Sequence, residues 1–149
     1  MQKCFLAFAM VLWLANVSFA QTEAPLELSV TTSSDRSFIL TDPQEVLKHE
    51  GELVVVEGCV INASWKEQVK GRPIFLDMFD AFPNNILTVA IWEEDQAQFL
   101  AASEYHQKMV RVTGKAKKRA AKPSDKAPMD RVTISLHDPK QITILGDCK

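Results

Sequence analysis

The chain has 149 residues, of which 46% are hydrophobic and 24% are charged, and its formal net charge is −2. This length fits one domain of ordinary size with an extension. The near-neutral balance excludes a globally basic protein, so any basic site must come from the local distribution of charge.

Residues 1–20 have the pattern of a secretory signal peptide. Lys3 precedes an uninterrupted apolar run at residues 5–15, and residues 18–20 end in alanine with a small residue three positions from the expected cleavage. We therefore expect an exported chain that begins at Gln21 when mature. The apolar run is too short for a stable bilayer anchor and no later segment is longer, so membrane insertion is not expected.

Residues 21–40 are rich in Thr, Ser, Glu and Gln and predict a flexible leader, which leaves residues 41–149 for the domain. A short helix is expected to begin after Asp42 and to run to about residue 49. Asp42 has the position of an N-cap, Pro43 that of the first helical residue, and Glu45 completes a capping box.

Three strands are predicted in the first half of this domain. They are residues 53–61, 73–79 and 86–92, with turn-forming residues between them. Gly58 interrupts the first run, which indicates a bulge or a sharp bend of the kind that a barrel strand needs.

A helix and three more strands are expected in the second half. Residues 93–95 are acidic, as favoured in the first turn of a helix, and are followed by an apolar stripe. Residues 109–115 alternate in polarity and predict a fourth strand, residues 132–136 a fifth, and residues 142–145 a short terminal strand. The helical stripe comprises Ala97, Phe99, Leu100 and Ala101.

This order of three strands, a helix and two strands resembles the OB-fold, a five-stranded Greek-key barrel. The chain is similar in particular to a small bacterial family of exported, nucleic-acid-binding-like OB-fold domains. The resemblance covers about residues 45–146 and rests on the segments G-E-L-V-V-V-E-G-C-V from residue 51, P-I-F-L-D from 73, P-N from 83, V-A-I-W from 89, V-R-V-T-G-K from 110 and D-P-K-Q-I from 138. It implies a mainly β barrel with one helix between the third and fourth strands and a short N-terminal helix, in an exported and periplasmic protein.

The resemblance also implies where a ligand binds. OB-folds bind on the face of their second and third strands, between the loops that join strands one to two and four to five. Residues 75–78, F-L-D-M, resemble the F-[IL]-D-[LM] stretch of anticodon-binding OB domains, in which the phenylalanine stacks on a base. Both loops are basic here, so the predicted nucleic-acid-binding residues are Phe75, Trp65, Lys66, Lys70, Arg72, Lys115, Lys117, Lys118 and Arg119.

The aromatic residues have a second interpretation. Phe75 is either a stacking platform or a residue that only packs under a neighbouring loop, and Trp65 either stacks or anchors its own loop. Trp92 ends the third strand, where packing is favoured over binding. Asp77 would repel phosphate unless it is paired.

Cys59 and Cys148 remain in the mature chain and can form one disulfide, the alternative being a buried Cys59 thiol and a free Cys148. His49, His106 and His137 are too scattered for a metal site, and no phosphate-binding glycine loop or nucleophile motif occurs. We therefore expect a protein that is not an enzyme and has no metal or cofactor.

Two functions fit these observations. The first is binding of single-stranded nucleic acid or nucleotides through Phe75, Trp65 and the basic loops. The second is an envelope module that binds a protein or a glycan, which export itself favours.

Overall fold

A computed structural model describes residues 39–124, 126 and 129–149 of the chain. The predicted signal peptide and residues 21–38 of the predicted leader lie outside this part. The last two residues of that leader, Ile39 and Leu40, form strand β1, which pairs in parallel with Val55 and Val56 of β2.

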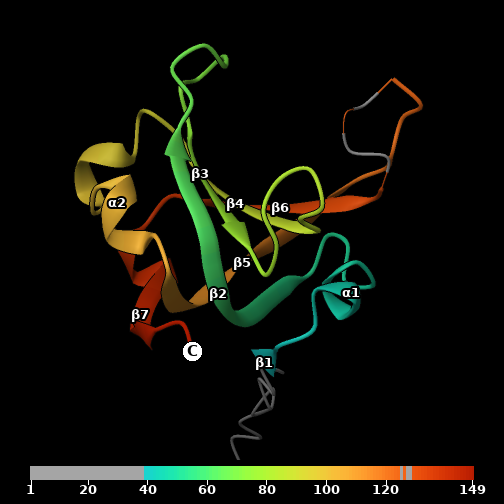
Figure 1. The fold of residues 1–149 in the computed structure, drawn as a ribbon, viewed down its shortest axis with the longest axis horizontal. Helices are drawn as coiled ribbons and strands as arrows, with labels where there is room; N and C mark the ends of the chain where they lie inside the picture. Colours follow the sequence, from blue (N-terminus) through green and yellow to red (C-terminus); the bar gives the residue numbers. More distant parts are fainter. Residues whose placement is uncertain (1–38, 125, 127–128) are drawn as a thin grey trace, which may run out of the picture. The chain divides into compact units, whose positions relative to one another are not determined.

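Five strands close into a barrel (Figure 1). Their spatial order is β2-β3-β4-β6-β5, and pairing of β5 with β2 closes the circle; the β4–β6 pair is parallel and the other pairs are antiparallel. The strands are β2 (Leu53–Trp65), β3 (Ile74–Met78), β4 (Leu87–Ile91), β5 (Lys108–Arg119) and β6 (Arg131–Leu136). The domain is an OB-fold. The predicted fold class, including a helix between the third and fourth barrel strands, is confirmed.

The barrel core comes from the period-two alternation of the strands. Every second residue of β2 from Val54 to Val60 is buried, and β6 alternates in the same way. The largest fully buried side chains come from all five barrel strands and α1: Leu76, Met78, Leu87, Ile91, Ile134, Leu136, Val46, Val56, Val60, Val89, Val110 and Val112.

Strand β2 contains one extra residue near its middle. Val60 pairs with Met78, whereas Asn62 pairs with Asp77, so Ile61 is a β-bulge. The irregularity expected at Gly58 therefore lies three residues later. Gly58 itself makes room for an aromatic ring, because a Cβ there would lie 2.6 Å from the Cζ of Phe79.

Strand β5 is longer than predicted, and its two halves pair with different strands of the barrel. It pairs with β2 as far as Lys115 and with β6 from Ala116 to Arg119. At Gly114, where it crosses over, a Cβ would lie 2.4 Å from Cγ2 of Ile134, so only glycine allows the two strands to approach. Residues 116–119, which were expected to belong to the basic loop between the fourth and fifth strands, are thus strand.

The helical elements are short. In α1 (Pro43–Val46) the Asp42 carboxylate accepts a hydrogen bond from the Gln44 N–H at 2.8 Å, and Val46 is buried. The prediction of a single helix that begins at residue 93 was wrong. A 3-10 turn η1 (Gln96–Gln98) and a helix α2 (Ala102–Tyr105) occur instead. Phe99 and Ala101 between them are extended, which lets Phe99 and Tyr105 pack on the core while Leu100 stays exposed.

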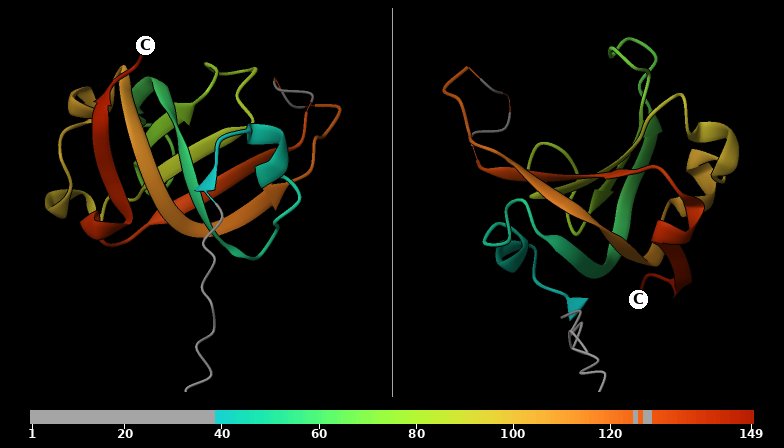
Figure 2. Two further views of the ribbon diagram at one scale, coloured as in Figure 1. Left: turned by 90° about the horizontal axis from the view of Figure 1, so that it is seen from below. Right: turned by 180° about the vertical axis from the view of Figure 1, so that it is seen from behind.

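The C-terminal end runs along the barrel. After the 3-10 turn η2 (Pro139–Gln141), strand β7 (Ile142–Asp147) pairs antiparallel with β5, as Figure 2 shows. Cys148 follows β7 and is joined to Cys59 of β2 by a disulfide, with a Cα–Cα distance of 5.6 Å. Within residues 39–124, 126 and 129–149, no helix has the length and apolarity needed to span a bilayer.

Candidate nucleic-acid interface

The outer face of β3, β4 and β6 carries two rows of side chains set by the strand registers. One row runs across Ser64, Phe75, Ala90 and Ser135. The next row runs across Asn62, Asp77, Thr88, Thr133 and Lys117. Because opposed residues in a sheet point to the same side, these segments, far apart in the chain, form one surface.

A cleft of about 760 Å³ lies on this surface. The β2–β3 hairpin contributes one wall and the β5–β6 hairpin another, and both hairpins extend beyond the barrel in Figure 1. Phe75 on β3 and Trp92 at the end of β4 form the aromatic part of the floor of the cleft, and Phe82 is a third aromatic lining residue. The cationic lining residues are Lys66, Lys117, Lys118, Arg119, Lys126 and Arg131.

Phe75 and Trp92 differ in how they are held. Phe75 is half-buried and lines the cleft, with the small Ala90 as its cross-strand partner. Trp92 donates a hydrogen bond from Nε1 to Oγ of Ser135 at 3.1 Å. A Cβ on Gly71 would lie 3.0 Å from Trp92 Cε3, so the indole is also packed against the β2–β3 loop. Trp92 is therefore both a packing residue and part of the cleft.

The cations of the cleft are not equivalent. Lys118 pairs with Asp130 at 2.9 Å, and Arg131 stacks over Phe82 at 5.5 Å from the ring centroid. The Ala121 N–H and the Lys118 ammonium hold the pKa of Asp130 below its ordinary value. Lys66, Lys117 and Lys126 form no ion pair within the part of the chain that the structure describes, so they are available to phosphate.

The acidic side chain on the floor is almost enclosed. Asp77 is 5% exposed and accepts hydrogen bonds from Nδ2 of Asn85 at 2.9 Å and from Nδ2 of Asn62 at 3.2 Å. Thr88 Oγ1 lies 3.4 Å from the same carboxylate. These donors replace water around Asp77, so its carboxylate is satisfied by hydrogen bonds and has no cationic partner among them.

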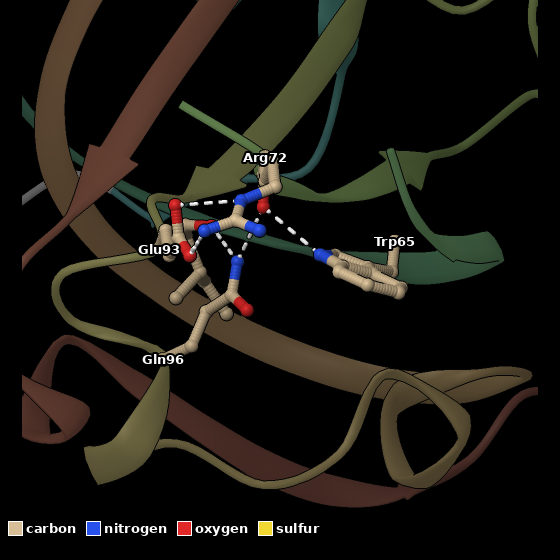
Figure 3. Close-up of polar contacts among 5 residues, drawn as sticks. Trp65, Arg72, Glu93 and Gln96 are labelled. Atoms are coloured by element: carbon tan, nitrogen blue, oxygen red, sulfur yellow. Dashed lines mark hydrogen bonds and ion pairs between the residues drawn. The ribbon is translucent and has the colours of Figure 1, made fainter. Parts of the chain in front are cut away.

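Trp65 and Arg72 lie outside the cleft, although the sequence placed them in the site. Figure 3 shows the Arg72 carbonyl accepting hydrogen bonds from Trp65 Nε1 at 3.1 Å and Gln96 Nε2 at 2.7 Å. The Arg72 guanidinium pairs with the Glu93 carboxylate, with Nε to Oε2 at 2.8 Å. Trp65 thus anchors its hairpin, which is the second interpretation given for it above.

The bulge at Ile61 explains the position of Trp65. Continued alternation from Val60 would put Trp65 on the outer face with Phe75. The extra residue shifts the alternation, so Ser64 pairs with Phe75 and Trp65 pairs with the inward-facing Ile74.

Two predicted lysines also lie elsewhere. Lys70 is exposed at the tip of the β2–β3 hairpin and does not line the cleft, and Lys115 lies where β5 still pairs with β2. Among the aromatic and cationic residues that line the cleft, four were not predicted as site residues: Phe82, Trp92, Lys126 and Arg131. The alternation of Arg131, Thr133 and Ser135 with buried residues was the signal that could have placed Arg131 on this face.

No group of three or more His, Cys, Asp or Glu side chains that could hold a metal ion occurs among residues 39–124, 126 and 129–149.

No protein family matches the sequence of this chain, and no curated protein matches it. Solved structures similar to it include an aspartyl-tRNA synthetase from Entamoeba histolytica, with 17% identity and a TM-score of 0.45 over 73% of this chain and 21% of the enzyme. A putative aspartyl-tRNA synthetase from Leishmania major Friedlin has 12% identity and a TM-score of 0.46 over 78% of this chain and 22% of the enzyme. An asparaginyl-tRNA synthetase from Entamoeba histolytica has 17% identity and a TM-score of 0.38 over 67% and 22%. The chain spans about a fifth of the length of these enzymes.

Proposed function

We propose that this protein is an exported, non-enzymatic OB-fold module that binds single-stranded nucleic acid in the cleft on β3, β4 and β6. The observation that carries the proposal is that the Phe75 and Trp92 rings line the same cleft as a set of cations from both flanking hairpins. Rings on a floor with cations on the walls are the arrangement that single strands require.

The chemistry divides between floor and walls. A base stacks on Phe75, a contact worth about 1–3 kcal/mol that accepts any base. Lys66 and Lys126 are on opposite hairpins, so phosphates on either side of the stacked base meet a cation. Duplex bases are already stacked on each other and cannot reach Phe75, so single strands are the preferred ligand.

Export is supported by the predicted signal peptide and by the disulfide. A bridge between Cys59 and Cys148 is typical of proteins in oxidising compartments. We place the protein in the periplasm because the family it resembles is bacterial. Fractionation of cells that produce the full chain tests this, and retention in the cytoplasm with an uncleaved N-terminus would contradict it.

Fluorescence anisotropy with a labelled single-stranded oligonucleotide, at low and at moderate salt, tests the binding proposal. We expect binding at low salt that weakens as salt rises, because each neutralised phosphate contributes a slope of about 0.7 in log K against log salt. A duplex of the same length should bind more weakly.

Lys66→Gln and Lys70→Gln form a matched pair for this experiment. Both lysines are exposed in the same hairpin loop, but only Lys66 lines the cleft. Lys66→Gln should reduce the salt slope by about 0.7, and Lys70→Gln should leave it nearly unchanged. Absence of binding at low salt would reject the proposal and favour an envelope protein or a glycan as the partner; equal losses in the two variants would reject the cleft as the site.

A further inference from the structure

A second groove of about 550 Å³ adjoins the cleft. The two share three lining residues, Lys117, Thr133 and Ser135, which belong to β5 and to the outer face of β6. The cleft and the second groove are therefore neighbours on either side of this short line of polar side chains.

The path of β5 creates the second groove. This strand pairs with β6 only from Ala116, opposite Ile134, to Arg119, whereas its earlier part, Met109 to Lys115, pairs with β2. The rest of β6, from Ser135 to Leu136, continues without β5 beside it. The opening left between β6 and β5 is filled in part by Gln141, whose Nε2 donates to the Thr113 carbonyl at 3.1 Å.

The side chains of the second groove suit a nucleic-acid strand. Lys115 and Lys117 are exposed on the same edge and form no ion pair within the described residues, while His137 pairs with Asp95 at 2.7 Å. Leu53 is 71% exposed and offers an apolar surface beside Lys115, its cross-strand partner. Glu50 is the one acidic residue among the lining residues.

We propose that a bound single strand continues from the cleft, over the hydroxyls of Thr133 and Ser135, into the second groove. There Lys115 neutralises a phosphate and Leu53 contacts a base or sugar. The hydroxyls donate to backbone oxygens on the way, a contact that positions a strand without reading its sequence. This inference rests on the proposed function and extends it, because it assigns the protein a long binding track and assigns Lys115 a role at its far end.

Oligothymidylates of about 4 and about 12 nucleotides, both within the range of site sizes for OB-folds, test the track. The short oligonucleotide fills the cleft alone, and the longer one reaches the second groove. Lys115→Gln should reduce the salt slope by about 0.7 for the longer oligonucleotide and leave that of the shorter one unchanged. Leu53→Ser should weaken binding of the longer oligonucleotide only.

A longer oligonucleotide can bind in more registers, which raises its apparent affinity for every variant equally. Affinity is therefore compared as the ratio of the dissociation constants of the variant and the unaltered protein at each length. Lys70→Gln, which removes the same charge outside both grooves, is the control. An equal effect of Lys115→Gln on both lengths, or on neither, would overturn the track while leaving the cleft intact. Failure of both lengths to bind would instead reject the proposed function.

Discussion

The indole of Trp92 at the end of β4 donates a hydrogen bond to the hydroxyl of Ser135 on β6, with 3.1 Å between Nε1 and Oγ. This bond holds a tryptophan at the floor of the cleft, whereas Trp65 is bound to the Arg72 carbonyl outside it. The fluorescence of the two tryptophans of the described chain is therefore sensitive to different surfaces of the domain.

Tryptophan fluorescence should follow binding through Trp92. Addition of single-stranded oligonucleotide to the Trp65→Phe variant is expected to change the emission about as much as in the unaltered protein. In Trp92→Phe the change should be lost. A full response in Trp92→Phe would mean that the ligand binds elsewhere.

Phe75→Ala should weaken binding by about 1–3 kcal/mol, which is about 5-fold to 150-fold in the dissociation constant. The reason is loss of the stacking surface, so Phe75→Trp should retain most of the affinity. Anisotropy measures both variants, and their unfolding curves show whether the barrel is intact. Unchanged affinity in Phe75→Ala would show that the ring only packs.

Asp77→Ala should destabilise the fold by about 1–3 kcal/mol. It removes an acceptor of the side-chain amides of the buried Asn85 and the half-buried Asn62, and unsatisfied buried donors carry a cost of this size. Asp80→Ala is the control, because Asp80 is exposed and such changes usually stay within about 0.5 kcal/mol. Urea unfolding compares the two, and equal stability would show that the Asp77 contacts contribute nothing.

Cys148→Ser should lower the free energy of unfolding by about 2–4 kcal/mol, because the bridge closes a segment of 89 residues and restricts the unfolded chain. A reductant should destabilise the unaltered protein and have no further effect on the variant. Thiol titration of the mature, denatured and unreduced protein should find neither cysteine reactive. Two reactive thiols would contradict the bridge.

The barrel strands could be predicted from the sequence because each strand has a local pattern of polar and apolar residues. Alternation at β2 and β6 and the apolar β4 follow from burying one face of each strand, whatever the neighbours are. Strand β5 was predicted too short, because the consecutive cations Lys117, Lys118 and Arg119 break the alternation of polar and apolar residues that identifies a strand. The acidic residues 93–95 predicted a helix, but contacts of Phe99 and Tyr105 with the core divide that segment.

The sequence by itself determined that this chain forms a β barrel, that Phe75 lies outside it beside the buried Leu76, and that basic residues gather in two segments. Only the tertiary structure decided which of these side chains meet. One bulged residue, Ile61, turns Trp65 away from Phe75, and the crossing of β5 at Gly114 separates Lys115 from Lys118. Pairing register and barrel closure are long-range properties, so the binding surface that they build cannot be found in any single segment.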